Sequence, residues 1–341
     1  MNNTPFHERR RQQFLYEDLY AKTRENQVQL INGQLKNKQT AETTEDHSIV
    51  HRFLYLETFW IWMLDYTAGV PLSELAPRIT GIVDAFEEWN NIHQQFLKEA
   101  ALEFPEYGSY EYHAAPDFSI LFDYEDTLQL LSIAILLRDL RSIKRIIHIL
   151  RSHRGEDGLF EQLIGGYIED DMALSSCVLG DPYDILLQVF YEEDEQKTLD
   201  LLDRYLKQWY PAMKDHPRWY DEHLNINKEG YAGYYGYWAF EAAAVVYLLD
   251  LNDSQVNHLV YPKDLVDYAR TLREQDRYTS LDTETPIRSG RVEGGQPCPQ
   301  TGFWETPAKS QSRRHFTQGD PMPVFKDSEY GHTIWQWSEE Q

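Results

Sequence analysis

DYEDTLQLLSIAILLRDLRSIKRIIHIL, residues 123–150, has the clearest helical pattern in the chain. Its later apolar residues recur at intervals of three and four, the spacing of one face of a helix; they are Leu136, Leu140, Ile143, Ile147 and Leu150. Gly155 and Gly158 follow a few residues later, and glycine commonly ends a helix. The stretch therefore predicts a helix between Asp123 and Leu150 that the two glycines close.

Helical patterns continue on both sides of this stretch. Segment 49–66 is dense in aromatic side chains and predicts a buried helix, and a face with helical spacing runs from Ile79 to Leu97 after Ser73, which can cap that helix. Further helices are expected over residues 8–30, 183–191, 194–210, 234–251 and 261–273, with Pro211 ending the third of these. The linkers are short and polar, so we predict an all-α fold, a multi-helix bundle of antiparallel hairpins.

The character of the sequence changes after Tyr278. Glycine and proline become frequent there, and apolar residues occur only in short clusters. We expect a loop-rich C-terminal appendage with a short β-hairpin, which packs on the helices through Trp304, Trp335 and Trp337. The chain then divides into an N-terminal helical region (1–115), a central acidic helical domain (116–277) and a Gly/Pro/Trp-rich C-terminal module (278–341), with a break near 104–116 between the first two.

Acidic residues are concentrated in one part of the chain. Between Glu156 and Asp203 there are fourteen acidic side chains and a single lysine, Lys197, in a chain whose net charge is −24. Like charges at this density repel one another, and they also repel nucleic acid and anionic membranes. We therefore expect neither nucleic acid nor a membrane as partner, and a cationic partner is the simplest use of the acidic stretch.

Other uses of these residue types have weaker support. Any charge run can be a solvated face. A calcium loop needs alternating ligands, whereas Asp170 and Asp171 are adjacent. Cys298, His315 and His332 are the zinc candidates of the tail, but no paired spacing joins them. Neither cysteine has an activating neighbour, and the chain has no nucleophile elbow and no phosphate-binding glycine loop. The sequence thus predicts no catalytic residue, no cofactor and no metal.

The composition is that of a folded, soluble chain. With 341 residues, 42 % hydrophobic and 14 % aromatic, it can bury a substantial core. Cys177 and Cys298 show no paired spacing and predict free thiols. The N-terminus, MNNTPFHERRRQQF, lacks the apolar segment of a signal peptide, and the apolar segments 53–64 and 128–137 are too short to span a bilayer. We expect a cytoplasmic protein.

Glycine and aromatic residues mix in GYAGYYGYWAFEAAA, residues 230–244, before they lead into a helix. Small residues let helix backbones approach while aromatic side chains fill the gaps, so this pattern predicts close packing, with Trp238 in a structural role. Glu241 is unusual, because it is a carboxylate in an apolar helix. A position near the helix N-terminus would stabilise its charge through the helix dipole, and we assign it a structural role.

The same segment carries a resemblance. GYYGYWAFEAAAVVYLLDLNDS (233–254) and YPKDLVDYAR (261–270) resemble the C-terminal helical domain of PoNi-type immunity proteins, the antidotes to PoNe-type DNase toxins of interbacterial competition. CPQTGFWETPA (298–308), SRRHFTQGDPMP (312–323) and YGHTIWQW (330–337) resemble a C-terminal module of predicted immunity proteins of polymorphic toxin systems, including type VI secretion systems. The resemblance implies an all-helical fold, a cognate toxin as partner, and inhibition by binding without catalysis.

Charge and resemblance agree on an acidic toxin-binding surface. A nuclease holds phosphate with basic residues, so an acidic inhibitor can occupy its cationic face and speed the encounter. We therefore predict an immunity protein that neutralises a secreted antibacterial toxin, most simply a DNase, through acidic connectors between helices. The predicted toxin-binding residues are Glu169, Asp170, Asp171, Glu192, Glu193, Asp194 and Glu195, with Tyr167 and Tyr191 as aromatic anchors.

Three alternatives stay open at this point. Abundant carboxylates and tyrosines are also compatible with an α-helical carbohydrate-active enzyme that uses paired carboxylates. A helical scaffold without a toxin partner would have the same composition. The aromatic-rich helices also allow self-association into a homodimer, although no heptad pattern supports it.

Overall fold

The computed structural model describes residues 4–103, 116–170, 172–214, 219–282, 291–299, 301–309, 312–325 and 333–337. Contacts divide the chain into two compact units, Met1–Leu272 and Arg273–Gln341, which we call unit 1 and unit 2. Each unit has a hydrophobic core of its own. The break expected near 104–116 lies almost entirely outside the described residues.

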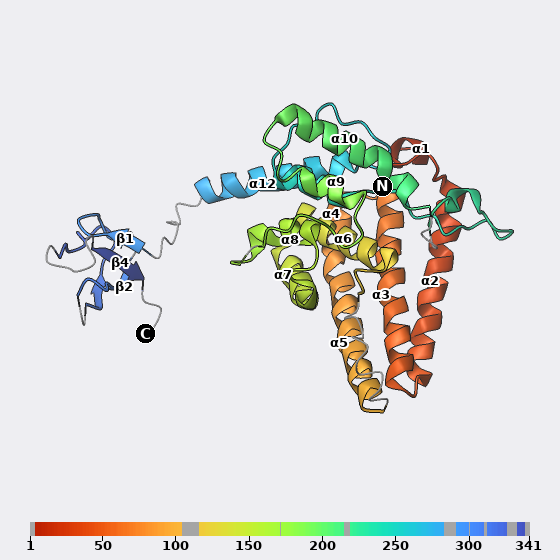
Figure 1. Cartoon of the computed structure of the whole chain (residues 1–341), viewed down its shortest axis with the longest axis horizontal. Coiled ribbons are helices and arrows are strands. Elements are labelled where there is room, and N and C mark those ends of the chain that lie inside the picture. Colours follow the sequence, from red (N-terminus) through yellow and green to blue (C-terminus); the bar gives the residue numbers. More distant parts are fainter. Residues whose placement is uncertain are drawn as a thin grey trace. The chain divides into compact units, whose positions relative to one another are not determined.

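Three long helices run side by side in the first part of unit 1, with α3 packed between α2 and α5 (Figure 1). They are α2 (Glu17–Thr40), α3 (Thr44–Thr67) and α5 (Ile79–Glu103), and the short α1 (Phe6–Arg9), α4 (Leu72–Leu75) and η1 (Ala76–Arg78) connect to them. α3 begins at Thr44 because Thr43 and Asp46 cap it reciprocally: the Asp46 amide donates to Thr43 Oγ1 at 3.0 Å, and the Thr43 amide donates to Asp46 Oδ2 at 3.2 Å. Ser73 lies inside α4, so it does not cap the next helix as expected.

The stretch 123–150 forms two helices, α6 (Leu121–Leu136) and α7 (Leu140–Ile149), and the expectation of a single helix is wrong. Arg138 adopts a left-handed backbone conformation, with φ of 55°, which ends the first helix. The side chain of Asp139 then accepts the Ser142 amide at 3.1 Å and caps the second. The apolar pattern continues through the break because both helices pack on the same core.

Four of the remaining helices match the predictions over 183–191, 194–210, 234–251 and 261–273, with shifted ends, whereas the helix over 158–164 and the short 3-10 helices were not predicted. These remaining helices are η3 (Arg151–His153), α8 (Gly158–Ile164), η4 (Gly165–Tyr167), α9 (Tyr183–Gln188), α10 (Glu195–Ala212), η5 (Glu222–Leu224), α11 (Phe240–Leu248) and α12 (Lys263–Asp282). Pro211 lies inside the last turn of α10, so it does not end the helix as expected. α11 begins six residues later than predicted, because the Gly/Tyr segment before it is not helical.

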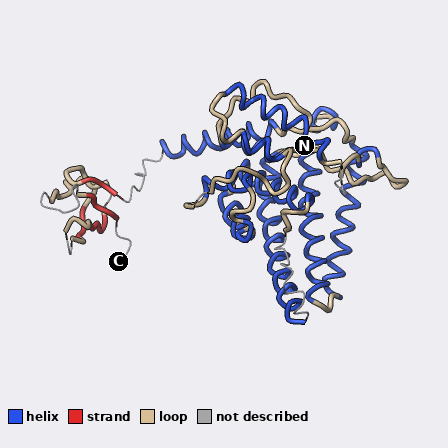
Figure 2. The backbone as a smooth tube through the Cα atoms, viewed as in Figure 1, coloured by secondary structure: helices blue, strands red, loops and turns tan. Residues whose placement is uncertain are grey.

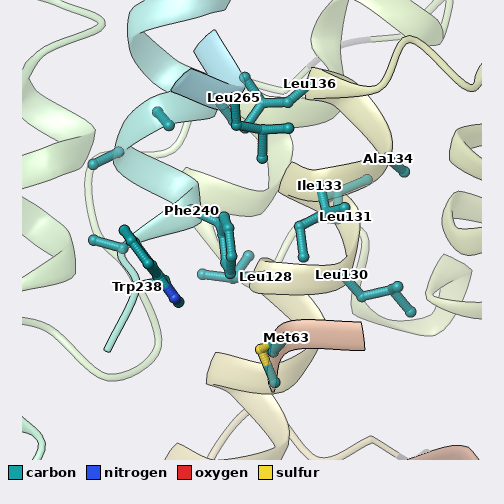
Figure 3. Close-up of a cluster of buried hydrophobic side chains, with 14 of the residues drawn as sticks. Met63, Leu128, Leu130, Leu131, Ile133, Ala134, Leu136, Trp238, Phe240 and Leu265 are labelled. Carbon is teal, nitrogen blue, oxygen red and sulfur yellow. The ribbon is translucent and has the colours of Figure 1, made fainter. Parts of the chain in front are cut away.

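The core of unit 1 is centred on α6. Every residue from Phe122 to Leu136 is buried, and α11 and α12 contribute Phe240 and Leu265 to the same cluster (Figure 3). Trp238, just before α11, is buried, and its indole N–H donates to Thr67 Oγ1 of α3 at 2.8 Å. The core therefore ties together helices that are far apart in the sequence.

Strands occur, within the described residues, only in unit 2, where they form a four-stranded antiparallel sheet in the order β1-β4-β2-β3 (Figure 2). They are β1 (Arg291–Glu293), β2 (Gly302–Glu305), β3 (Arg314–Phe316) and β4 (Ile334–Trp337). β2 and β3 form the expected hairpin, with Phe303 opposite His315, and β4 and β1 extend it. The appendage is thus more ordered than predicted.

The tryptophans of unit 2 build its own small core. Trp304 and Trp335 are completely buried, and they pack with Cys298, Phe316 and Met322, whereas the sequence led us to expect that they pack on the helices. Trp337 lies opposite Trp304 in the sheet register, and its side chain is outside the described part. The fold is mostly helical, as predicted, with a minor antiparallel sheet. None of the described helices combines the length and the apolar character needed to cross a membrane.

Candidate partner-binding site

The acidic residues predicted to bind a partner lie on two connectors of unit 1. We call residues 168–182, between η4 and α9, the acidic loop, and residues 191–195, between α9 and α10, the acidic turn. Of the residues predicted to bind the toxin, Tyr167 and Glu192 are half-buried. The exposed ones are Glu169, Asp170, Tyr191, Glu193, Asp194 and Glu195. Asp171 lies outside the described residues.

Arg154 holds the start of the acidic loop. Its Nη2 donates to the carbonyl oxygen of Asp170 at 2.6 Å, and its Nε pairs with the buried carboxylate of Glu161 at 2.9 Å. The same carboxylate accepts the Gly155 amide at 2.7 Å. Glu161 is therefore a structural residue, although the sequence places it in the acidic stretch, and it fixes the loop through one arginine.

Asp157 holds the middle of the loop. One carboxylate oxygen caps α8 by accepting the Phe160 amide at 2.8 Å, and the other accepts the Val178 amide at 2.8 Å and the Tyr124 hydroxyl at 2.9 Å. The side chain is completely buried, and this burial raises its pKa. Asp157 thus also belongs to the framework and not to the surface. A capping aspartate directly before a glycine and an apolar run is a local signal that could have identified it.

Gly158 lets the loop lie close against α8. Its amide donates to the Ser176 carbonyl at 2.9 Å, and a Cβ atom built on it would come within 2.6 Å of Leu187 Cδ2 and 2.9 Å of that carbonyl oxygen. A side chain would therefore push the loop away from the helix. The glycine is required here for close packing and not, as expected from the sequence, to close the preceding helix.

Tyr191 joins the acidic turn to the acidic loop. Its hydroxyl donates to the Leu174 carbonyl at 3.1 Å and lies 3.1 Å from the Gln162 amide nitrogen of α8, which donates to it. Half of its surface, 50 %, still faces solvent. Tyr167 differs, because it packs against the main core near Tyr247, and burial raises its pKa to about 12. Of the two predicted anchors, Tyr191 presents the larger accessible face.

The acidic turn is ordered by its own carboxylates. Asp194 Oδ1 accepts the Lys197 amide at 3.0 Å and caps α10, and Glu192 Oε1 accepts the Asp194 amide at 3.0 Å. A groove of about 500 Å³ lies beside the turn, between Tyr191 and Leu201 of α10. The turn therefore presents an aromatic face, a groove and carboxylates on ordered backbone.

Several carboxylates of this surface have no ion-pair partner among the described residues. In the part of the chain that the structure describes, Glu169, Asp170, Glu193 and Glu195 form no ion pair. Other acids of the stretch are compensated, since Glu156 lies 2.7 Å from the ring of His153 and Asp203 lies 2.5 Å from Lys207 Nζ. The structure thus separates framework acids from solvated acids, a division that the sequence does not show.

Two further carboxyl groups lie deep in the core. Glu241, at the second position of α11, accepts the Tyr205 hydroxyl at 2.6 Å, and Glu125 of α6 accepts the Trp219 indole N–H at 3.3 Å. Both are almost completely buried, and burial raises the pKa of each to about 8. Sequence reasoning noticed Glu241 but missed Glu125, which has no unusual local context.

The structure describes two of the three metal candidates of the sequence, Cys298 and His315. Cys298 is buried in the core of unit 2, His315 packs edge-on against the ring of Phe303 with centroids 5.3 Å apart, and His332 is outside the described residues. No group of three or more His, Cys, Asp or Glu side chains in the described residues is placed to hold a metal ion. Cys177 is also buried, and burial raises the pKa of its thiol.

A comparison with known protein families finds a match that covers this region. Residues 155–265 match the family model described as PoNe immunity proteins (PoNi), C-terminal, which confirms the resemblance carried by the segment that begins at Gly233. The resemblance of the tail segments between 298 and 337 lies outside this match and stays a prediction. The match runs from the end of η3 into α12 and contains the acidic loop and the acidic turn. No curated protein sequence matches the chain.

A solved structure shares the fold. It is described as protein PA2201 from Pseudomonas aeruginosa, with a TM-score of 0.59 and 18 % sequence identity over 77 % of this chain and 92 % of that one. At this identity the likeness concerns the fold alone. The carbohydrate-active enzyme considered from composition is not favoured by the family match.

Proposed function

We propose that this PoNi-type immunity protein binds a cognate secreted antibacterial toxin and neutralises it, and that the toxin is a nuclease with a cationic active face. The observation that carries the proposal is the set of unpaired carboxylates on the acidic loop and the acidic turn, inside the region that matches the immunity family. The protein acts as an inhibitor and not as an enzyme.

The electrostatics favour this kind of partner. A nuclease binds the phosphate backbone through lysine and arginine side chains, so its active face is positively charged. A chain of net charge −24 that leaves Glu169, Asp170, Glu193 and Glu195 unpaired attracts such a face from a distance. Steering of this kind raises association rates by about 10–10³-fold at low salt, which helps an antidote to bind the toxin before DNA does.

The order of the loop favours tight binding. Arg154, Asp157 and Gly158 hold the loop backbone through buried or half-buried contacts, so little conformational entropy is lost when a partner docks. Tyr191 adds a half-exposed aromatic ring beside a groove, the kind of feature that supplies binding energy at the centre of interfaces. Charge thus governs the rate of encounter, and Tyr191 contributes to the lifetime of the complex.

The test uses the product of the gene next to the gene for this chain as the candidate toxin. Asp170, Glu193 and Glu195 are changed together to lysine, and association with the toxin is measured at low and high salt. A control variant changes three exposed acids elsewhere to lysine, namely Glu42, Glu99 and Glu274, so that both variants have the same net charge.

We expect the first variant to associate roughly tenfold or more slowly than the control at low salt, and to lose protection of DNA in a nuclease assay. Equal rates for both variants would show that only net charge matters and would refute the placement of the site. A chain that neither co-purifies with the toxin nor inhibits it would refute the function itself.

A further inference from the structure

The buried residues of helix α2 all lie in its first half. The helix is 24 residues long, and its buried residues are Leu19, Thr23 and Gln27. No residue of α2 after Gln27 is buried, although the helix continues for more than three turns to Thr40. It packs mainly on α3, and Lys38 near its end pairs with Glu88 of α5 at 3.1 Å. Helical segments in proteins owe most of their stability to packing of an apolar face. In the described part of unit 1, the side chains on the outward side of this second half remain exposed.

The middle of α2 is also free of charge. Residues 26–35, NQVQLINGQL, contain no charged side chain, in a protein whose charged fraction is 26 %. Glu25 stands directly before this segment and Lys36 directly after it. Eleven residues separate them, which is close to three full turns, so both lie on the same side of the helix. An exposed helix with one negative end, one positive end and an uncharged middle is an unusual surface for so acidic a chain.

The uncharged side between these ends exposes apolar and amide groups. Val28 is 38 % exposed and Leu35 is 46 % exposed, and their spacing of seven residues places them on one flank. Gln29 and Asn32, both exposed, lie between Glu25 and Lys36. This outward face, defined by residues 25, 28, 29, 32, 35 and 36, is what we call the α2 face.

Gly33 independently indicates that another helix packs beside the α2 face. A glycine inside a helix costs about 1 kcal/mol relative to alanine, so it normally has a reason. Here a Cβ atom would find nothing within 4 Å, so packing within the chain does not require the glycine. A missing side chain beside the α2 face lets the backbone of another helix approach closely.

We propose that the α2 face binds the same face of a second copy of this chain, with the two α2 helices antiparallel about a two-fold axis. Such an axis near residues 30 and 31 reverses the helix direction, so residue 25 of one copy faces residue 36 of the other. Glu25 then meets Lys36 of the partner subunit, and Gln29 meets Asn32 of the partner subunit. Val28 lies opposite Gly33 of the partner subunit, with Leu35 of the partner subunit next to it on the same flank. Each contact occurs twice.

The chemistry of the α2 face favours a second copy of this chain, and not a toxin, as its binding partner. Two chains of net charge −24 repel each other over most of their surfaces, and an uncharged face is where they can approach. Side-chain amides both donate and accept hydrogen bonds, so Gln29 and Asn32 are complementary to each other. A cationic partner, in contrast, is attracted to the acidic loop and the acidic turn.

Sedimentation of the full chain over a range of concentrations tests the proposal. The wild type is expected to form a concentration-dependent dimer. Because the ion pair occurs twice in the dimer, Lys36→Glu should raise the dissociation constant roughly tenfold. Lys144→Glu makes the same charge change on the exposed side of α7 and serves as control. The double variant Glu25→Lys with Lys36→Glu restores the pair with reversed signs and should restore the dimer.

Disulfide cross-linking is a second test of the interface, and it does not require a measured dissociation constant. Asn32→Cys lies near the proposed axis and should form an intermolecular disulfide under mild oxidation, whereas Arg141→Cys on exposed α7 should not. The native Cys177 and Cys298 are buried and do not compete. Circular dichroism verifies that each variant remains helical.

Three outcomes would overturn the proposal. The wild type could remain a monomer at all concentrations, or Lys36→Glu could behave as Lys144→Glu does, or the double variant could fail to restore the dimer. Loss of toxin binding by Lys36→Glu in a monomeric wild type would assign the α2 face to the toxin instead. Each of these results leaves the test of the acidic surface unaffected.

Discussion

Replacing Glu241 by glutamine tests how a buried carboxyl group affects the stability of the core. Glu241 is 1 % exposed, and its Oε1 accepts the Tyr205 hydroxyl at 2.6 Å. Burial, with a smaller contribution from the nearby Glu125, raises its pKa from the ordinary 4.5 to about 8. The folded protein therefore keeps a proton at neutral pH that the unfolded chain has released.

The sign and size of the effect follow from this difference in proton binding. A carboxyl group whose pKa is raised by folding contributes its full stability below its unfolded pKa and loses it as the pH rises toward the folded pKa. The free energy of unfolding should thus fall by about 1.4 kcal/mol per pH unit between about pH 4.5 and 8 because of this one group. Between about pH 5 and 8 the loss is roughly 4 kcal/mol.

Glutamine has no proton to lose, and its carbonyl oxygen can still accept the Tyr205 hydroxyl. The difference in free energy of unfolding between Glu241→Gln and wild type should therefore shift in favour of the variant by roughly 4 kcal/mol from about pH 5 to 8. Urea denaturation at a series of pH values measures it. Parallel stability curves for the two proteins would refute the reasoning.

A companion variant should act in the opposite direction. The hydrogen bond from Tyr205 lowers the pKa of Glu241, against the larger effect of burial. Tyr205→Phe removes it, so the decline in stability should extend to higher pH, and the variant should be destabilised by about 1–3 kcal/mol because a buried acceptor loses its donor. An unchanged pH profile in Tyr205→Phe would show that the two groups do not interact as the structure indicates.

Three further substitutions have specific expected results. Gly158→Ala would bring a Cβ atom within 2.6 Å of Leu187, so we expect a loss of about 1–3 kcal/mol and faster amide exchange over residues 168–182, measured by hydrogen exchange. Gly236→Ala forces a side chain onto a backbone with φ of 117° and within 2.2 Å of Thr67 Oγ1, and thermal unfolding should show a loss of more than about 1 kcal/mol. Trp304→Ala empties the core of unit 2 and should cost about 3–5 kcal/mol there, so hydrogen exchange should rise in residues 291–337 and stay unchanged in α6; a rise in both would contradict the separate cores.

The acidic surface shows how far sequence reasoning reaches. The sequence located the excess of carboxylates, and their position on connectors between helices followed from the helical pattern. It did not show that Asp157 and Glu161 are framework residues, because their partners are Val178, Tyr124 and Arg154, which only the fold brings to them. Whether an acid is solvated or buried depends on contacts that composition does not record.

The resemblance to the immunity family was available from the strings at 233–254 and 261–270, and the family match over residues 155–265 confirms it. The small sheet was harder to predict from the sequence, since its strands are only three or four residues long and come from separated segments. Pairs such as Val292 with Trp335 form only when two strands far apart in the sequence, β1 and β4, meet. A period of two cannot be recognised in so few residues.

The helical character of this protein, its acidity and its resemblance to PoNi-type immunity proteins follow from the sequence alone. These properties depend on neighbours along the chain: a helix repeats every 3.6 residues, a charge run is visible as a run, and a family string is read in order. Tertiary structure alone decided where the helix over 123–150 breaks, which carboxylates remain in water, and that Glu125 and Glu241 share one core. The physical reason is burial, because the pKa of a carboxyl group and its availability to a partner depend on the residues that surround it in space.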